Sequence, residues 1–312
     1  MELSVVVPVY NEKENLKILH TELSETLNSL QAEYEILFID DGSTDGSELE
    51  LKEIVKKDKR ARLIRFTRNF GQTSAISAGI DHSSGTYLVT IDADLQNDPG
   101  DIPVLLQKAR EGFDVVSGWR KRRKDAYFAK TLPSVIANFI ISGITGINLH
   151  DYGCTLKIYE SKLIKSLRLF GEMHRFLPAL LGYSGARIAE IEVNHRPRIA
   201  GKSKYGISRT FKVILDLFTV KFMGHYLGKP IYLFGGWGIF LIFISGLLAM
   251  ATLYNKFYHG IFVKDQPLFL VAILLSIIGF QMLLLGLLAE IMVRIYYETG
   301  RKPSYFIKEK IL

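Results

Sequence analysis

The sequence predicts an α/β domain built on a parallel sheet, followed by a hairpin of two transmembrane helices. Two observations predict this combination. Within residues 1–118, short apolar runs alternate with amphipathic segments, a pattern typical of a parallel sheet that helices cover on both faces. In the C-terminal third, residues 231–254 and 267–289 contain no charged side chain, and each run is long enough to cross a hydrocarbon core of roughly 30 Å.

The expected strands of the sheet are apolar runs rich in β-branched residues. They lie at residues 3–9, 34–40, 62–66, 87–92 and 113–118, and the helices between them are expected at 13–30, 44–58, 72–82 and 99–111. Polar residues follow three of these strands, at 10–12, 40–43 and 92–94. Because ligands of such sheets bind beyond the carboxyl ends of the strands, we expect a site at this edge.

Basic residues around the two apolar runs predict their topology. Nine basic residues flank the pair on its outer sides: Arg209, Lys212, Lys221, Lys229, Arg294, Arg301, Lys302, Lys308 and Lys310. The connecting loop has two, Lys256 and Lys264. Basic residues concentrate in cytoplasmic segments, so both termini are expected in the cytoplasm. The alternative is a pair of buried core helices, which is disfavoured because two such long uncharged runs are rare in one soluble domain.

Two further segments are expected to lie at the membrane surface. In 211–222 the apolar residues form one helical stripe: Phe211, Ile214, Leu215, Phe218 and Phe222. The stretch 131–149 is also uncharged, but its proline, glycine and polar residues make it a poor spanning helix. We therefore expect both segments to be interfacial. For each, the alternative is a helix that packs on the globular domain.

Several classes of site are excluded by residue counts and spacing. The chain has one cysteine, Cys154, which excludes an intramolecular disulfide framework and a cysteine-cluster metal site. Residues 201–203 imitate the end of a phosphate-binding P-loop, but Arg196 stands where that motif requires glycine. The first residues lack a basic stretch before an apolar run, so no signal peptide is expected.

Charge is divided unevenly along the chain. The 312 residues have a net charge of +7, but residues 1–118 contain 12 basic and 21 acidic side chains, and residues 119–312 contain 27 and 11. Nucleic acid is not expected as the partner of the basic part, because its basic residues surround the membrane segments and the candidate pocket is acidic. The division instead separates an acidic half from a half that borders the membrane.

The pair Asp92 and Asp94 is a candidate metal site. The two carboxylates come at the end of an apolar run and can cooperate if the chain turns out of the sheet there. Carboxylate oxygens suit Mg²⁺ or Mn²⁺ shared with substrate phosphates, and Gln96 could add an amide oxygen. The alternative is a solvated loop. Asp40 and Asp41 likewise either cap the next helix or accept hydrogen bonds from a base or ribose.

Four motifs together resemble one enzyme family. They are PVYNE at 8–12, DDGSTDGS at 40–47, RNFGQTSAISAG at 68–79 and DADLQ at 92–96. Their order is similar to that of inverting GT-A glycosyltransferases of family 2, in particular the polyprenyl-phosphate glycosyltransferases. The resemblance implies a GT-A (Rossmann-like) nucleotide-diphospho-sugar transferase domain. The QxxRW motif of processive members is absent, which argues against a polymerase.

The resemblance also implies roles for individual residues. It places a set of residues around the nucleotide, its base and its ribose: Pro8, Tyr10, Glu12, Asp40 or Asp41, Arg68 and Gly71. It places Asp92, Asp94 and Gln96 at the metal on the diphosphate. Two positions match the acceptor side, where Arg120 is basic and Asp151 is either a catalytic base or an orienting group.

A third group of residues follows a family pattern, RxxGxSK, close to the phosphates. Arg198, Gly201, Ser203 and Lys204 match it. Together with the basic run 120–124, these side chains are candidates for holding phosphates, since arginine can make bidentate contacts with them. A solvated loop, or contact with anionic lipid, are the alternatives for 120–124.

These observations predict a cytoplasmic GT-A catalytic domain at 1–204, an interfacial helix at 205–229, a transmembrane hairpin at 230–290 and a cytoplasmic tail at 291–312. The expected reaction at the bacterial inner (plasma) membrane is transfer of one hexose, glucose from UDP-glucose, to undecaprenyl phosphate. A divalent cation, Mg²⁺ or Mn²⁺, is the expected cofactor, and a homo-oligomer is compatible with the reaction. Alternatives are another donor, GDP-mannose or a UDP-aminosugar, and a non-catalytic membrane scaffold.

Overall fold

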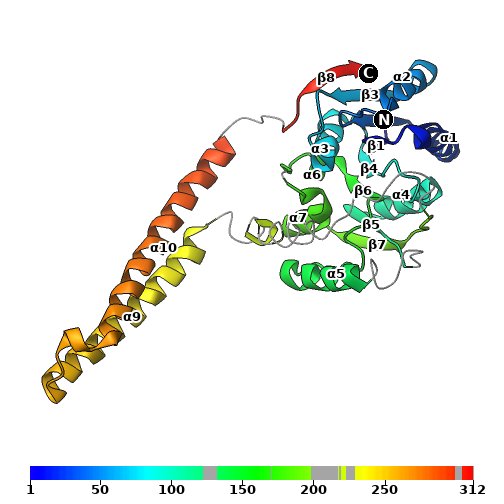
Figure 1. Cartoon of the computed structure of the whole chain (residues 1–312). Coiled ribbons are helices and arrows are strands. Elements are labelled where there is room, and N and C mark those ends of the chain that lie inside the picture. Colours follow the sequence, from blue (N-terminus) through cyan, green and yellow to red (C-terminus); the bar gives the residue numbers. More distant parts are fainter. Residues whose placement is uncertain are drawn as a thin grey trace. The chain divides into compact units, whose positions relative to one another are not determined.

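The computed structural model describes residues 1–121, 132–169, 171–197, 217, 219–222, 229–298 and 304–311. It divides into two compact units (Figure 1). The first comprises Met1–Val220 together with Pro303–Leu312, and the second comprises Lys221–Lys302. The first unit contains the sheet and the second contains the two long apolar helices.

The sheet of the first unit has eight strands in the described part of the chain, in the order β7-β5-β6-β4-β1-β2-β3-β8. Their bounds are β1 Leu3–Val9, β2 Tyr34–Asp40, β3 Ala61–Phe66, β4 Tyr87–Thr90, β5 Val115–Trp119, β6 Lys157–Glu160, β7 Ile188–Glu192 and β8 Ile307–Ile311. The five strands predicted within residues 1–118 all run in the same direction, and the two antiparallel strands are ones that the sequence did not predict. Strand β6 runs antiparallel between β4 and β5, and β8 runs antiparallel beside β3.

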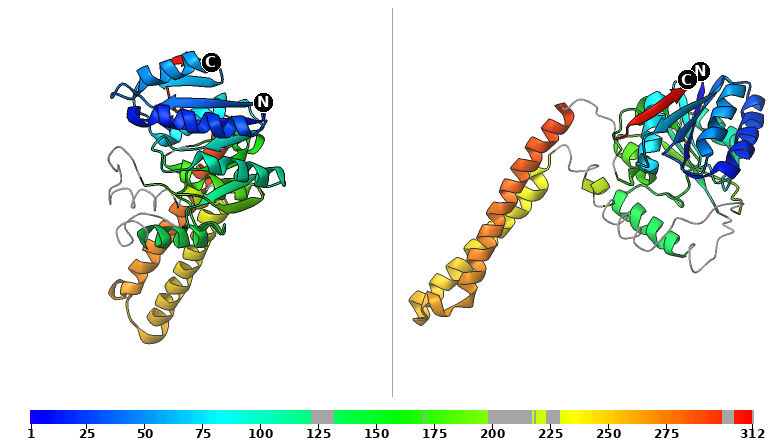
Figure 2. Two further views of the ribbon diagram at one scale, coloured as in Figure 1. Left: turned by 90° about the vertical axis from the view of Figure 1, so that its right-hand side faces the viewer. Right: turned by 45° about the horizontal axis from the view of Figure 1, so that its top comes forward.

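Helices cover both faces of the sheet, as predicted. Their bounds are α1 Lys13–Ser29, α2 Ser47–Lys57, α3 Gln72–His82, α4 Ile102–Arg110, α5 Leu132–Thr145, α6 Ser161–Ile164 and α7 Leu177–Tyr183, with short 3₁₀ turns η1 Pro99–Asp101 and η3 Met173–Phe176. Helix α1 contacts α2 and α4 on one face, while α3 contacts η3, and η3 contacts α7, on the other. Figure 2 shows these layers from two sides.

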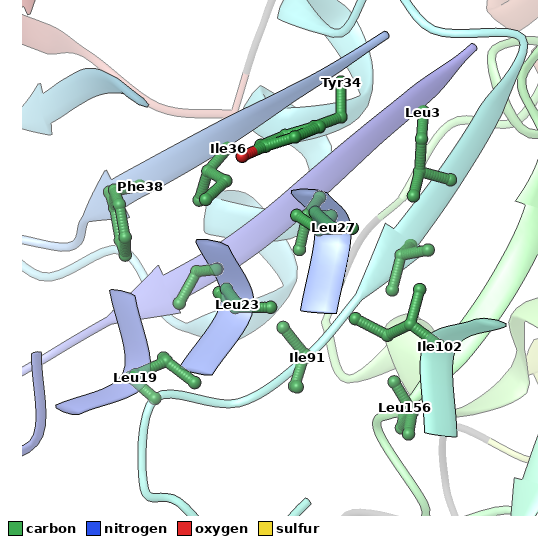
Figure 3. Close-up of a cluster of buried hydrophobic side chains, with 14 of the residues drawn as sticks. Leu3, Leu19, Leu23, Leu27, Tyr34, Ile36, Phe38, Ile91, Ile102 and Leu156 are labelled. Atoms are coloured by element: carbon green, nitrogen blue, oxygen red, sulfur yellow. The ribbon is translucent and has the colours of Figure 1, made fainter. Parts of the chain in front are cut away.

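The main core lies between α1 and the sheet (Figure 3). Leu19, Leu23 and Leu27 recur at intervals of four along α1 and are fully buried against the side chains of β1 and β2. Burying three leucines contributes about 1.5–3 kcal/mol each. On the opposite face, α3 approaches β1 so closely that a Cβ at Gly79 would overlap the Val6 side chain. The central strands are therefore fixed from both sides.

Strand β8 joins the sheet from the far end of the sequence. Residues 291–312 are expected to form a cytoplasmic tail, and no strand is predicted there. In the structure, Ile307–Ile311 pairs with β3, with Leu63 opposite Ile311 and Ile64 opposite Lys310. Figure 2 displays this red C-terminal strand beside the blue strands of the N-terminal half. The last residues of the chain therefore belong to the same unit as the first.

The second unit is a helical hairpin, as predicted. Helix α9 spans Ile231–His259, α10 spans Pro267–Glu298, and the turn η4 at Val263–Asp265 lies between them. The helices lie side by side (Figure 1), in contact at Gly238 and Gly279, and the Ser245 hydroxyl donates to the Ala272 carbonyl over 2.7 Å. In the most apolar stretch of each helix, only 17% of the residues of α9 and 11% of those of α10 are buried. That exposure contradicts a pair of soluble core helices and suits contact with lipid.

The two segments expected at the membrane surface are described only in part. In α5 the polar residues that disfavour a spanning helix face the protein: Asn138 donates to the His150 carbonyl and Ser142 to the Leu149 carbonyl. The Phe139 side chain points outward and is 79% exposed. One face of α5 thus packs on the first unit. Most of 211–222 lies outside the described residues.

Candidate active site

The aspartate pair lies directly beyond the carboxyl end of β4. The strand ends at Thr90, two residues before the predicted end, and the chain then turns, with Leu95 at the left-handed φ of +60°. The Gln72 side chain at the start of α3 donates to Asp92 over 2.7 Å, and the backbone amide of Gln96 donates to Asp94 over 3.2 Å. The turn that allows both carboxylates to act together is therefore present.

The two carboxylates repel each other. Burial and, to a lesser extent, the neighbouring charge of Asp94 raise the pKa of Asp92 to about 6, while Thr155, Arg120 and Lys157 oppose the shift. No group of three or more acidic, histidine or cysteine ligands occurs in the described residues. Two carboxylates fit a hard divalent cation whose other ligands are phosphate oxygens and water.

Asp40 and Asp41 have different partners at the end of β2. Asp40 is fully buried, accepts the Ser43 amide over 2.9 Å and pairs with Arg65 at 3.3 Å. Asp41 accepts the amides of Phe70 at 2.6 Å and Gly71 at 2.9 Å. Burial raises the pKa of Asp41 to about 6, although both amides oppose the rise. Asp40 thus fixes its own turn, while Asp41 joins two loops.

Glycine is required where these two loops meet. Gly42 has φ +71°, and a Cβ there would lie 2.5 Å from the Arg68 backbone. Gly71 precedes α3 with φ +94°. The exposed Arg68 guanidinium lies 4.3 Å from the centre of the Phe70 ring. The loop that contains Arg68 and Gly71 therefore lies beside Asp41 and Gly42.

The PVYNE segment borders the same edge. Pro8 lies past the last β1 residue that pairs with β4, so its missing amide interrupts no hydrogen bond to that strand. Asn11, at φ +56°, accepts the Thr44 amide over 2.8 Å. The Glu12 carboxylate accepts from Asn15. Tyr10 follows β1 directly. Tyr10 and Glu12 thus lie on the loop that faces residues 43–47, and Pro8 lies near the end of β1, which leads into this loop.

Arg120 and Asp151 form a two-point ion pair. Arginine Nε lies 2.7 Å from Oδ2 and Nη2 lies 3.0 Å from Oδ1. The amide of Gly153 also donates to Asp151, which is 1% exposed. Both carboxylate oxygens are thus held by donors. The indole of Trp119 stacks on His150 at 4.3 Å next to this pair.

Gln72, Thr155 and the buried Lys157 were not predicted from the sequence. The Lys157 ammonium donates to the carbonyls of Tyr152, at 3.1 Å, and Cys154. Burial lowers its pKa. Gln72 follows Gly71 inside a recognised motif and could have been found there. A lysine in a short apolar run gives no such signal, because its contacts depend on the insertion of β6 between β4 and β5.

The RxxGxSK pattern lies outside the described residues, as do Arg198, Ser203 and Lys204. The chain that leads into it is described. The amide of Arg196 donates to the Gln96 carbonyl over 2.9 Å, and His195 forms a β-bridge with Asn97. The segment that precedes Arg198 therefore contacts the turn that holds Asp94.

The model of glycosyl transferase family 2 matches residues 4–168, more than half of the chain. The chain belongs to this family. Family 2 membership confirms that the protein is a glycosyltransferase, and it makes the non-catalytic scaffold untenable.

Two relatives extend the match beyond the catalytic unit. The dodecaprenyl-phosphate galacturonate synthase of Rhizobium johnstonii is 41% identical over 313 residues, which cover 99% of this chain and 93% of the relative. The undecaprenyl-phosphate 4-deoxy-4-formamido-L-arabinose transferase of Proteus mirabilis is 37% identical over 312 residues, with 99% and 94% covered. The predicted resemblance to polyprenyl-phosphate glycosyltransferases is confirmed.

A solved structure supports the fold of this family 2 enzyme. Glucosyl-3-phosphoglycerate synthase from Mycobacterium tuberculosis, in complex with Mn²⁺ and UDP-glucose, superimposes with a TM-score of 0.56 over 72% of this chain and 78% of that one. The identity is 16%, so the likeness concerns the fold alone. It confirms the predicted GT-A class.

Proposed function

We propose that this enzyme transfers a single sugar from a nucleoside diphosphate to a polyprenyl phosphate, with inversion at the sugar. The principal observation is the match over 99% of the chain, apolar hairpin included, to two relatives that are named for polyprenyl-phosphate substrates. The exposed apolar faces of α9 and α10 are consistent with a lipid acceptor. The reaction needs a donor site and an acceptor site on one sheet edge.

The donor side of this proposal uses the acidic turn. Asp92 and Asp94 would hold Mg²⁺ or Mn²⁺, with Gln96 as a further candidate ligand, and Gln72 orients Asp92 through its 2.7 Å hydrogen bond. When bound, the cation neutralises charge that develops on the leaving diphosphate. Of the two aspartates that could bind the nucleobase of the donor, Asp41 is favoured, because Asp40 is fully buried and paired with Arg65.

The acceptor side needs charge balance more than deprotonation. A lipid phosphate has a second pKa of about 6 and is already anionic at pH 7. Arg120 would bind it, and Asp151 fixes the guanidinium through two hydrogen bonds. Both oxygens of Asp151 accept from donors, which favours the orienting role over that of a base. Arg198, Ser203 and Lys204 are proposed as additional phosphate ligands.

The proposed location is the bacterial inner membrane. Helices α9 and α10 are long and apolar enough to cross it, and the nine basic flanking residues favour cytoplasmic termini. A cytoplasmic active site agrees with this orientation, because nucleotide sugars and the catalytic unit would share one compartment. The segments 131–149 and 205–229 are proposed to lie at the membrane surface, with the outward Phe139 toward lipid.

The sugar and the nucleotide of the donor are a separate part of this proposal. Sequence analysis favours UDP-glucose, whereas the two relatives are named for galacturonate and for 4-deoxy-4-formamido-L-arabinose. We propose a UDP-linked sugar and test it with purified enzyme, undecaprenyl phosphate and Mn²⁺. UDP-glucose, UDP-galacturonate, UDP-4-deoxy-4-formamido-L-arabinose and GDP-mannose are supplied together, and the lipid product is identified by mass spectrometry. A lipid-linked sugar is expected; no lipid product from any donor would contradict the proposal.

A further inference from the structure

The last residues of the chain pack on a loop of the candidate donor site. This C-terminal segment, residues 304–311, includes β8 and belongs to the catalytic unit. Its first residues lie beside the loop 67–71, which connects β3 to α3. The backbone amide of Thr67 donates to the Phe306 carbonyl over 3.0 Å, and so the strand pairing continues into the loop itself.

Aromatic rings join the C-terminal segment to both ends of this loop. Tyr305 stacks on Phe66, the last residue of β3, with ring centres 4.9 Å apart and planes 16° apart. Phe306 lies 6.1 Å from Phe70 in a tilted arrangement. Aromatic pairs of this kind contribute more stability than the burial of their apolar area accounts for. The ring contacts therefore restrain the loop where it leaves β3 and again where it enters α3.

Tyr305 also joins the loop to the helix that follows it. Its side chain is 4% exposed, and its hydroxyl donates to Asp81 near the end of α3 over 2.9 Å. Burial and the Asp81 charge raise the pKa of Tyr305, so the phenol stays protonated and keeps donating. At the start of α3, the Ser74 and Ser304 hydroxyls lie 3.4 Å apart. The position of α3 thus depends on the C-terminal segment.

The loop is in turn a partner of Asp41. The amides of Phe70 and Gly71 donate to the two oxygens of Asp41, and the first residue of α3, Gln72, donates to Asp92. A shift of the loop would therefore alter both the candidate base-binding carboxylate and a candidate metal ligand. Neither carboxylate contacts the C-terminal segment directly in the contacts described.

We infer that the C-terminal segment, through Tyr305 and Phe306, positions the loop 67–71 and is thereby a structural part of the donor pocket. This inference rests on the proposed nucleotide-sugar donor. Tyr305 is a positioning residue that acts through Phe66 and α3. The alternative role for the segment is to cover the edge of β3, since exposed edges invite pairing with other chains. If the segment only protects this edge, changes at Tyr305 should have no selective effect on the affinity for the nucleotide.

The test is a UDP titration of the full-length enzyme in detergent with Mn²⁺, combined with steady-state kinetics. Tyr305→Ala removes both the stack and the hydrogen bond, and Tyr305→Phe keeps the stack. Lys308→Ala changes an exposed side chain of the same strand. Leu27→Ala is the control for general stability, because Leu27 is buried near the C-terminal end of α1 and far from the loop in sequence.

We expect Tyr305→Ala to raise the Kd of UDP and the KM of the donor about tenfold, and to change the KM of the lipid acceptor less than twofold. Tyr305→Phe is expected to restore most of the UDP affinity, and Lys308→Ala to match the wild type. An unchanged UDP Kd in a folded Tyr305→Ala enzyme would overturn the inference. So would an equal loss of UDP affinity in Leu27→Ala at matched thermal stability.

The same titration separates this inference from the proposed function. If the wild-type enzyme binds UDP and forms lipid product while Tyr305→Ala binds UDP equally well, the donor proposal stands and the role of the C-terminal segment is wrong. If the wild-type enzyme binds no UDP, the proposed UDP-linked donor and the inference both fail.

Discussion

Arg120 and Asp151 meet through two hydrogen bonds of 2.7 and 3.0 Å, between a mostly buried arginine side chain and an aspartate that is 1% exposed. Fork-shaped pairing of this kind fixes the plane of the arginine. The remaining donors of Arg120 then have a defined direction. In the proposed acceptor site, Asp151 can therefore act by orienting Arg120, without accepting a proton during the reaction.

The first prediction concerns that pair. Asp151→Asn and Arg120→Ala are each expected to lower kcat/KM for the lipid acceptor roughly 10- to 100-fold, the range of one charged hydrogen-bonded contact. Because Asp151 acts through Arg120, the double variant should be no worse than Arg120→Ala alone. A double-mutant cycle with both acceptor and donor kinetics measures this. Additive losses, or an acid limb of the pH profile that vanishes only in Asp151→Asn, would instead identify a base.

The second prediction concerns the metal. Asp94→Asn keeps the size of the side chain and removes its charge, so transfer should fall at least about 100-fold while the protein remains folded. Glu111→Gln neutralises an exposed carboxylate on the surface and serves as the control. Activity is measured with Mn²⁺ or Mg²⁺ and again with EDTA. Full activity of Asp94→Asn in EDTA would show that the cation is not needed.

Strands and helices whose formation depends on neighbouring residues in the sequence could be predicted well. The strands at 3–9 and 34–40 were placed without error, because apolar runs bounded by polar turns mark buried strands. Helix α3 was also predicted with its observed bounds. The carboxylate turn could be recognised because Asp92 and Asp94 follow such a run directly.

Contacts between distant segments could not be predicted in this way. Strand β6 has four residues, and β8 reads IKEKI, with three charged residues of five. An edge strand tolerates such composition because only one side of it is paired. The partners of Tyr305 and of Lys157 depend on these two strands. Sequence periodicity indicates which face of a strand or helix is buried, but not which element packs beside it. It therefore gives no information on the partners of Tyr305 or Lys157.

The third prediction concerns pH. Burial raises the pKa of Asp41 to about 6, so the free enzyme loses this negative charge as the pH falls through 6. A protonated carboxyl accepts the Phe70 and Gly71 amides more weakly than a carboxylate. The Kd of UDP is therefore expected to rise below pH 6 and to be constant from pH 7 to 8. In Asp41→Asn the affinity should be weaker at every pH, and its slope near pH 6 should become shallower; the slope that remains is assigned to Asp92, whose pKa is also about 6. A slope of wild-type size in that variant would assign the titration to another group.

The fourth prediction concerns the buried lysine. Lys157→Met preserves much of the side-chain volume but leaves the Tyr152 and Cys154 carbonyls without their donor, so the free energy of unfolding should fall by about 1–3 kcal/mol. Lys162→Met, on an exposed position of α6, should have little effect. Denaturant unfolding in detergent compares the two variants. Equal stability of Lys157→Met and the wild type would mean that water replaces the ammonium at no cost.

The fifth prediction concerns the hairpin and uses two glycines of the same helix. At Gly238 an added Cβ would lie 2.7 Å from the Gly279 carbonyl oxygen, whereas at Gly246 it would meet no atom within 4 Å. Gly238→Leu must therefore push α9 and α10 apart at the contact between Gly238 and Gly279, and overpacking of this kind costs about 1–3 kcal/mol. Gly246→Leu places the same side chain on a face that lipid would cover, where it is expected to be neutral. Thermal unfolding in detergent and gel filtration should show a lower midpoint for Gly238→Leu alone. If both variants lose stability equally, the exposed face of α9 is covered by protein rather than by lipid.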